Sequence, residues 1–281
     1  MSNEKELDEF HKDHPWPEKE GIESLFRFSS FDEKKLSRIS TLFIDLKLYH
    51  SLPVDFNDPF ECKPHFNWPK IPGKIRAIRE HLIKVAKKNG LKRKQAETLI
   101  SNQMSRPNFM QETITDATMK SFSELRICCF TTKKENLLFW SHYGNSHKGF
   151  CVEFDATKMP IAYAFKVKYE NEYPEIGYPR PRDARGFKPA LIKSKSWEYE
   201  EEFRTIFVPN IERQPKNDGS SLILNGDEIN NVYFGAKMLE EHKVKLLKII
   251  ECGPFRPEIW DTKLSKSDFK LEFKKYVKSK A

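Results

Sequence analysis

The sequence predicts an α+β fold whose core is a mixed or antiparallel sheet, with a helical insertion after residue 70. Short segments with strand patterns occupy the stretches before residue 50 and after residue 125. Between them, over about 73–122, charged residues and Gln alternate with apolar residues at helical spacing. The chain contains no internal repeat, so we expect a single α+β domain over 22–281.

The elements follow in order from a charged N-terminal segment. Residues 1–21 include Pro15 and Pro17, and we expect a flexible arm there. Asp32 is a suitable N-cap for a helix that ends at about Ser40. The other expected elements are a helix over about 237–247 and a Pro- and Gly-rich linker over 174–189. The expected strands lie within 24–29, 42–50, 126–131, 149–155, 162–169, 203–208, 231–235, 248–252 and, at a sheet edge, 269–277.

Composition limits the class of protein. The chain of 281 residues is 38% hydrophobic and 32% charged, and its 22 Phe and 5 Trp can supply a sizeable core. Its five cysteines include no CxxC pair, which argues against a zinc site or a disulfide framework. The N-terminus lacks a signal-peptide core, and no apolar run reaches the roughly 20 residues that span a bilayer. We therefore expect a cytoplasmic protein without a membrane partner.

The net charge of +8 favours anionic partners such as nucleic acid or phosphate-bearing cofactors. The densest basic segment, 84–94, contains no acidic residue. Its six basic residues are Lys84, Lys87, Lys88, Lys92, Arg93 and Lys94. They form either a solvated helical face or a surface that contacts nucleic-acid phosphates, and the sequence leaves both interpretations open.

An acidic loop with the sequence SLPVDFNDPFE begins at Ser51. Its two prolines remove backbone donors, so the loop can continue neither a helix nor a sheet ladder. Asn57 and Asp58 precede the second proline in a pattern typical of a rigid turn. Folds tend to place binding residues on such loops, so we expect Asp58 or Glu61 to reach a binding site. The alternative is a structural turn that only closes a corner.

An aromatic segment over 137–150 contains Trp140, His142 and Tyr143. These rings can hold a planar ligand or pack in the core. The spacing of its histidines is neither a helical ligand pair nor a known zinc pattern, so we expect no metal site here.

The segment WEYEEEFRTIF over 197–207 combines aromatic and charged residues. In an extended strand Glu200, Glu202 and Arg204 share one face. Two carboxylates and an arginine are costly in a core unless they are paired or used. The segment is therefore either an exposed edge strand with cross-strand ion pairs or a strand that holds a catalytic carboxylate.

In combination these segments resemble a known family. The order FRF, then Y-x-S-x-P-x-x-FNDPFE, then WSHY and HKGFCVEFD, then W-x-YE-x-E-F-R is similar to a widespread bacterial domain-of-unknown-function family over about 22–252. That family resembles DarT-type ADP-ribosyltransferases, which modify nucleic acid. The resemblance implies an ADP-ribosyltransferase-like sheet core, NAD as the substrate, and a role as a toxin or phage-defence effector.

The resemblance also implies roles for individual residues. Arg27 would hold the ribose or amide of NAD, and Tyr143 would pack on the nicotinamide ring. Glu202, or Glu200, would be the late-strand glutamate that stabilises an oxocarbenium-like transition state. The expected NAD-binding set is Arg27, Ser51, Asn57, Asp58, His142 and Tyr143, and the expected catalytic set is Glu200, Glu202 and Arg204.

Two other function classes fit the same residues. A metal-dependent nuclease would bind Mg²⁺ through carboxylates. Its candidate ligands are Asp58, Glu61, Glu200 and Glu202, although Arg204 stands where a lysine is expected. A non-catalytic module that binds nucleic acid or protein would use all these residues for structure.

For the transferase, Arg27, Tyr143 and one of the two late glutamates should line one pocket between two small sheets.

Overall fold

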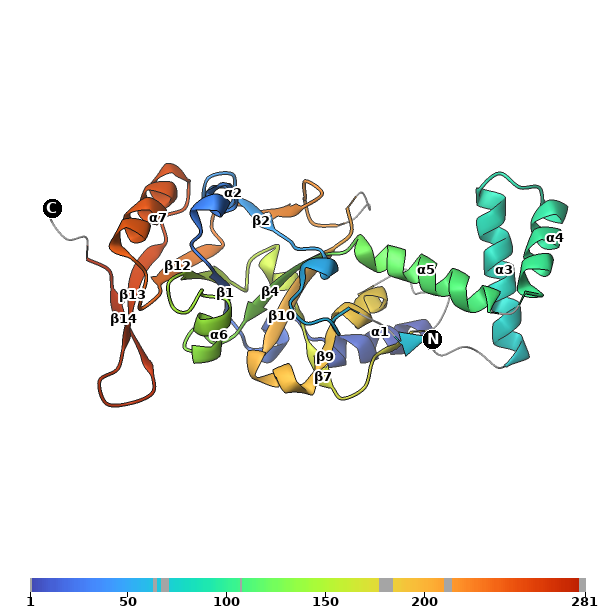
Figure 1. Ribbon diagram of the computed structural model, residues 1–281, viewed down its shortest axis with the longest axis horizontal. Coiled ribbons are helices and arrows are strands. Elements are labelled where there is room, and N and C mark those ends of the chain that lie inside the picture. Colours follow the sequence, from blue (N-terminus) through green and yellow to red (C-terminus); the bar gives the residue numbers. More distant parts are fainter. Residues whose placement is uncertain are drawn as a thin grey trace.

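The computed structural model consists of a sheet-centred body and a helical extension, and it describes residues 2–62, 65–66, 71–106, 108–176, 184–209 and 214–277 (Figure 1). The helices are α1 (Ser2–Asp13), α2 (Leu36–Phe43), α3 (Pro72–Lys88), α4 (Arg93–Met104), α5 (Phe109–Ser123), α6 (Leu137–His142) and α7 (Glu240–Cys252). The strands are β1 (Ser24–Ser29), β2 (Lys47–Tyr49), β3 (His65–Phe66), β4 (Arg126–Thr131), β5 (Phe150–Asp155), β6 (Phe165–Lys166), β7 (Lys168–Glu170), β8 (Glu175–Ile176), β9 (Ile192–Ser194), β10 (Glu202–Phe207), β11 (Ser221–Ile223), β12 (Ile229–Phe234), β13 (Glu258–Leu264) and β14 (Leu271–Lys275).

One large sheet organises the body. Among the described residues it has eight strands in the order β14-β13-β12-β5-β1-β4-β10-β6. The β12–β13 pair is parallel, whereas the other neighbours are antiparallel. The sheet is therefore mixed, and the predicted α+β class is confirmed.

The sheet is split between its two central strands, β1 and β4. β1 pairs with β5 along its whole length, and β4 does the same with β10. By contrast, β1 meets β4 at the single register pair of Phe26 and Thr131. Further along β4, Ser51 takes the place beside it through reciprocal backbone hydrogen bonds with Ile127, of 2.8 and 3.0 Å. The two halves of the sheet therefore separate toward the C-terminal end of β1.

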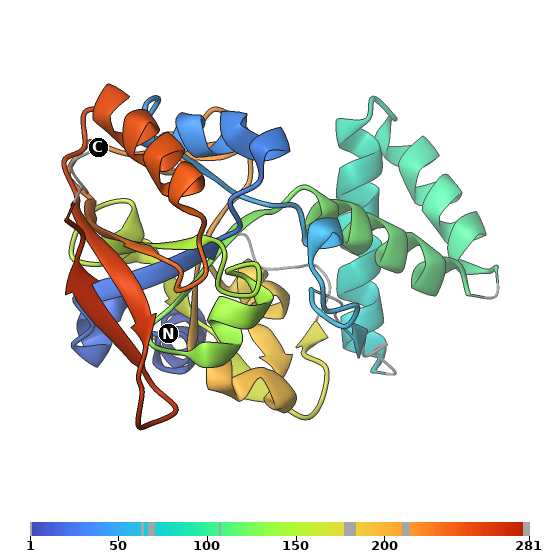
Figure 2. The same ribbon diagram turned by 60° about the vertical axis from the view of Figure 1, so that its left-hand side comes forward.

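Apolar side chains cover both faces of the sheet. On one face α2 and α7 lie side by side over a core that includes Leu25 and Phe154 (Figures 1 and 2). On the other face Phe26 and Phe28 pack with α6, and Phe10 of α1 joins a further cluster near β4 and β10. The apolar residues from which these strands are predicted are therefore buried on both faces of the sheet.

The insertion of α3, α4 and α5 projects away from the sheet (Figures 1 and 2). These helices lie where the apolar periodicity predicts them. Ile78, Leu82 and Ile100 form a small core between α3 and α4, separate from the core of the sheet. The insertion therefore buries its own apolar stripe.

The N-terminal segment differs from the expected flexible arm. It forms α1, in which Phe10 is 6% exposed. The imidazole Nδ1 of the buried His14 also hydrogen-bonds the carbonyl oxygen of Lys166 at 2.9 Å. The segment is attached because its few apolar side chains pack against the body.

Two later segments also differ from the expectation. Residues 248–252, expected as a strand, form the end of α7 because Ile250 continues the buried stripe of Leu246 and Leu247. Of the expected linker, residues 177–183 lie outside the described residues, and 184–190 form a 3₁₀ helix. No helix in the described part of the chain is both long and apolar enough to cross a bilayer.

Candidate functional site

A cavity of about 460 Å³ lies where β1 and β4 separate, and we call it the central cavity. Residues 26–28 of β1 and 127–130 of β4 line it. On β1, Arg27 shares the α2 face with Leu25, whereas Glu202 of β10 lies on the opposite face of the sheet, because it pairs with Thr131, which in turn pairs with Phe26. Both side chains nevertheless line the central cavity, because the split opens a passage between the two faces.

One end of the central cavity carries arginines that have no ion-pair partner among the described residues. An adjoining cavity of about 270 Å³ shares Arg27 and Tyr143 with the central cavity and adds Arg38 of α2. The Arg38 guanidinium lies 4.5 Å from the ring centroid of Tyr49 and is exposed. Free guanidinium groups beside a cavity favour an anionic ligand such as a phosphate.

The other end of the central cavity holds a buried ion network. Its members are Glu61, Lys193, Glu200, Glu202 and Arg204, each at most 7% exposed. Arg204 holds Glu202 with both ends of its fork, with Nε 2.6 Å from Oε1 and Nη2 2.8 Å from Oε2. The same Nη2 donates to Glu61 at 3.0 Å. Lys193 Nζ lies 2.7 Å from Glu61 and 3.2 Å from Glu202, and it donates to Glu200 at 2.5 Å. Three carboxylates therefore share two cations.

A tight turn brings Glu200 and Glu202 to the same side. Glu201 between them adopts a left-handed conformation with φ 44°, and its own side chain is 43% exposed. Thr131 Oγ1 donates to the carbonyl oxygen of Glu200 at 2.7 Å and holds the turn in place. A shared face by strand alternation requires an extended strand from Glu200, whereas β10 begins at Glu202. The two glutamates meet because of the turn and not because of strand alternation.

The two glutamates have different proton affinities. Burial and the charge of Glu202 raise the pKa of Glu200 against the opposing effect of Lys193. Burial would also raise the pKa of Glu202, but Arg204 and Lys193 outweigh it and hold this pKa at about 2. The hydroxyl of Tyr143 donates to Glu200 Oε1 at 2.8 Å. Glu202 is therefore a fixed anion, and Glu200 is the carboxylate suited to exchange a proton.

Most of the residues predicted from the sequence line the central cavity. They are Arg27, Ser51, Asn57, His142, Tyr143, Glu200, Glu202 and Arg204. Arg27, Tyr143 and both late glutamates therefore line one cavity, as predicted, but this cavity lies in the split of one sheet and not between two small sheets. The roles of these residues stay a prediction. Arg204 is fully buried, and its donors are occupied by Glu202, Glu61 and the carbonyl oxygen of Ala190. It can orient the carboxylates, but it has no free face for a ligand.

Asp58 does not join this set. Its Oδ1 accepts a hydrogen bond from the backbone N–H of Phe60 at 2.8 Å, which closes the turn that the sequence predicts. The side chain lines a neighbouring cavity, while Glu61 reaches the central one. The acidic loop therefore contributes through Glu61, whose carboxylate pairs with Arg204.

Lys193 is the member of the site that sequence reasoning missed. It lies on the short strand β9, just after the Pro- and Gly-rich segment, and no apolar pattern distinguishes it from the exposed Lys195. Its ammonium also lies 4.8 Å from the ring centroid of Trp197. The sequence signal for a second cation is indirect: if Glu61, Glu200 and Glu202 are all buried, Arg204 alone cannot balance their charges.

The basic residues of 84–94 lie on α3, on α4 and on the connection between them, and all six are exposed. This end of the insertion is distant from β1, β4 and β10 in the ribbon diagram (Figure 1). Arg93 pairs with Glu97 at 2.9 Å. The cluster is therefore a separate surface and not part of the central cavity.

Comparison with known proteins found no matching protein family, curated protein or solved structure. The chemistry of the site is therefore argued from its geometry. The two cavities together can hold an elongated anionic molecule, with its anion near Arg27 and Arg38. A positive charge that develops beside Glu200 and Glu202 would be stabilised by their carboxylates. The described residues include no group of His, Cys, Asp and Glu arranged to hold a metal ion.

Proposed function

We propose that this protein is an ADP-ribosyltransferase-like enzyme that cleaves NAD at the bond between nicotinamide and ribose. The observation that carries the proposal is the continuity of the two cavities from the unpaired Arg27 and Arg38 to Tyr143 and Glu200. NAD has its groups in the matching order, because an anionic pyrophosphate is linked through ribose to a planar, positively charged ring. The order of the sequence elements, which is similar to that of DarT-type enzymes, supports the same activity.

In the binding step, the two arginines neutralise the pyrophosphate through charge-assisted hydrogen bonds. The nicotinamide ring then lies against the aromatic wall that includes Tyr143 and Phe28. The side chain of Asn57 is within hydrogen-bonding reach of the Tyr143 hydroxyl and helps to hold the ring of Tyr143 in place. This arrangement brings the ribose toward Glu200.

In the chemical step, the bond between ribose C1′ and the ring nitrogen breaks, and its electron pair leaves with neutral nicotinamide. The ribose then carries an oxocarbenium-like positive charge. Glu202 supplies a fixed negative charge, because Arg204 and Lys193 keep it ionised and in place. Glu200 has the higher proton affinity and accepts the proton of the nucleophile that attacks C1′.

The ion network argues against the nuclease alternative. A magnesium site needs carboxylate oxygens that are free to bind the ion. Here Glu61 and Glu202 already bind Lys193 and Arg204 at 2.6–3.2 Å. Asp58, the fourth ligand of that hypothesis, lines a different cavity. The residues therefore suit charge stabilisation better than metal binding.

An assay of nicotinamide release from NAD tests the proposal. The reaction contains EDTA, and liquid chromatography measures the nicotinamide. Glu200→Gln keeps the size of the side chain and removes its charge, so it should lower turnover by on the order of 10²–10³. Glu198→Gln is the matched control, because Glu198 is an exposed carboxylate on the same 3₁₀ segment. The proposal is wrong if the wild type releases no nicotinamide. Cleavage of nucleic acid that disappears in EDTA and returns with Mg²⁺ would favour the nuclease.

Contact with nucleic acid is a second part of the proposal. The exposed basic cluster of 84–94 supports it, because clustered Lys and Arg residues bind phosphate backbones. Since the cluster lies on the insertion, it would recruit nucleic acid without itself entering the central cavity. It does not identify the group that accepts ADP-ribose.

A further inference from the structure

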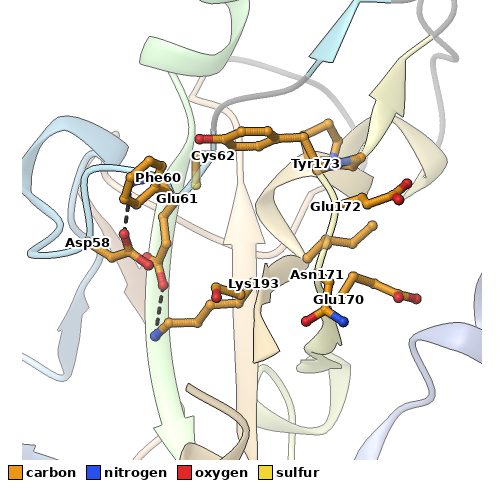
Figure 3. Close-up of a pocket in the computed structure, with 13 residues that line it drawn as sticks. Asp58, Phe60, Glu61, Cys62, Glu170, Asn171, Glu172, Tyr173 and Lys193 are labelled. Carbon is orange, nitrogen blue, oxygen red and sulfur yellow. Dashed lines mark hydrogen bonds and ion pairs between the residues drawn. The ribbon is translucent and has the colours of Figure 1, made fainter. Parts of the chain in front are cut away.

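We infer that a second subsite, beside the ion network, binds an organic cation. A cavity of about 290 Å³, which we call the side cavity, shares Glu61 and Lys193 with the central cavity. Asp58 and residues 60–62 of the acidic loop line it, together with residues 170–174, which begin at the last residue of β7 (Figure 3). The side cavity thus lies on the other side of the same buried carboxylates.

Asp58 supplies an unsatisfied acceptor to the side cavity. The residue is 6% exposed, and its Oδ1 is used by the backbone N–H of Phe60. Its Oδ2 is buried and has no hydrogen-bond partner among the described residues. A buried carboxylate oxygen without a donor is costly, so this atom calls for a donor that comes from a ligand. Figure 3 shows Asp58 and Glu61 on the same wall of the cavity.

The charges that remain in the side cavity are negative. Glu172 is exposed and has no cationic partner among the described residues, whereas Glu170 pairs with Lys168 at 3.1 Å. Lys193, the one cation among the described residues of the lining, is already held by three carboxylates. Asp58 and Glu172 are therefore uncompensated, and they attract a cation and repel a phosphate.

Two exposed aromatic rings complete the side cavity. Phe60 is 64% exposed and Tyr173 is 46% exposed, and their ring centroids are 6.4 Å apart. Rings that flank carboxylates at a cavity mouth suit a guanidinium or ammonium group, because the ring faces attract cations. The combination of an open acceptor, unpaired carboxylates and aromatic rings therefore selects an organic cation.

The use of this subsite for the acceptor rests on the proposed function, whereas cation binding does not. As acceptor, a molecule whose cationic end binds in the side cavity would extend past the shared Glu61 and Lys193 into the central cavity. Its amine or guanidine nitrogen there forms the new bond to ribose C1′ while the bond to nicotinamide breaks, and Glu200 takes the proton that the nitrogen loses. A nucleic-acid acceptor would instead bring phosphates to the anionic wall around Asp58. The geometry therefore favours a cationic acceptor.

Titration calorimetry with agmatine, in the absence of NAD, tests the subsite. Agmatine carries a guanidinium and an ammonium group, and putrescine serves as the arm with ammonium groups only. We expect saturable binding that is about tenfold weaker in Asp58→Asn, which keeps the Oδ1 acceptor for Phe60 and loses the charge. Glu172→Gln, a surface change that leaves the fold intact, should weaken binding by a few fold. Glu241→Gln on α7 is exposed, lies outside the cavity and should bind normally.

Either of two results would overturn the inference: no agmatine or putrescine binding by the wild type, or binding that neither Asp58→Asn nor Glu172→Gln weakens. Displacement of agmatine by a short oligonucleotide at the same site would overturn it as well. Because calorimetry omits NAD, failure of the cation subsite is distinct from failure of NAD cleavage, which nicotinamide release without agmatine measures. If both hold, mass spectrometry should detect ADP-ribosylated agmatine, and less of it with Asp58→Asn.

Discussion

Replacement of Lys193 by methionine should destabilise the protein far more than a change of a surface lysine. The side chain is 4% exposed and contacts carboxylates of Glu61, Glu200 and Glu202. Methionine fills a similar space but leaves these groups with Arg204 as their remaining cation in the described network. Loss of one partner from a buried ion pair costs about 3–5 kcal/mol, because the other charges stay desolvated and uncompensated. We expect a loss in that range at neutral pH.

Urea unfolding followed by tryptophan fluorescence measures this loss. Lys195→Met is the control, because Lys195 is exposed, lies two residues away and has no ion pair among the described residues. Without Lys193 the pKa values of the buried carboxylates rise, so their ionised forms destabilise the fold above those values. Mild acid then protonates them, and the deficit of Lys193→Met should shrink from pH 7.5 to pH 5. A cost no greater than that of Lys195→Met, within about 0.5 kcal/mol, would refute the network's role.

Three further predictions concern the rest of the molecule. The pKa of Glu202 is lowered from 4.5 to about 2, so its stabilisation is complete above the ordinary value and is lost as pH falls toward 2. Glu202→Gln should flatten this acid limb in urea unfolding between those pH values, and an unchanged slope would contradict the assignment. A Cβ on Gly149 would lie 2.1 Å from the carbonyl oxygen of Ser29, so Gly149→Ala should cost at least about 1–3 kcal/mol, whereas Gly73→Ala, in open space, should cost nearly nothing. Nucleic-acid binding, measured by fluorescence anisotropy, should weaken steeply as the salt concentration rises. Glutamine replacements of the basic residues within 84–94 should reduce this salt dependence. An affinity that does not change with salt would indicate that the cluster is only a solvated face.

The sequence predicts the elements of the site better than it predicts their connections. Arg27 and Tyr143 can be placed from a strand pattern and an aromatic segment, and their convergence with Glu200 is what the family resemblance implies. The split between β1 and β4 has no local signal, because it depends on Ser51 pairing with β4 in place of β1. Long-range pairing of this kind is decided by packing and not by residue preference.

The charge network shows the same limit. An acidic loop and a strand with Glu202 and Arg204 indicate that ion pairs must form, because bare charges are too costly to bury. The identity of the second cation, Lys193, depends on the pairing of β9 with β7, which lies outside the large sheet. The left-handed turn at Glu201 likewise has no signature, since glutamate rarely adopts positive φ. Such positions are fixed by their surroundings and are hard to recognise from one sequence.

Steady-state kinetics of nicotinamide release from NAD separate the binding role proposed for Arg27 from the catalytic role proposed for Glu200. Arg27→Gln should raise KM about tenfold or more with little change in kcat, because a charge-assisted hydrogen bond to the bound anion contributes about 1.5–3 kcal/mol. Glu200→Gln should lower kcat by on the order of 10²–10³ and leave KM within a few fold. An unchanged KM in Arg27→Gln, or full kcat in Glu200→Gln, would contradict the account.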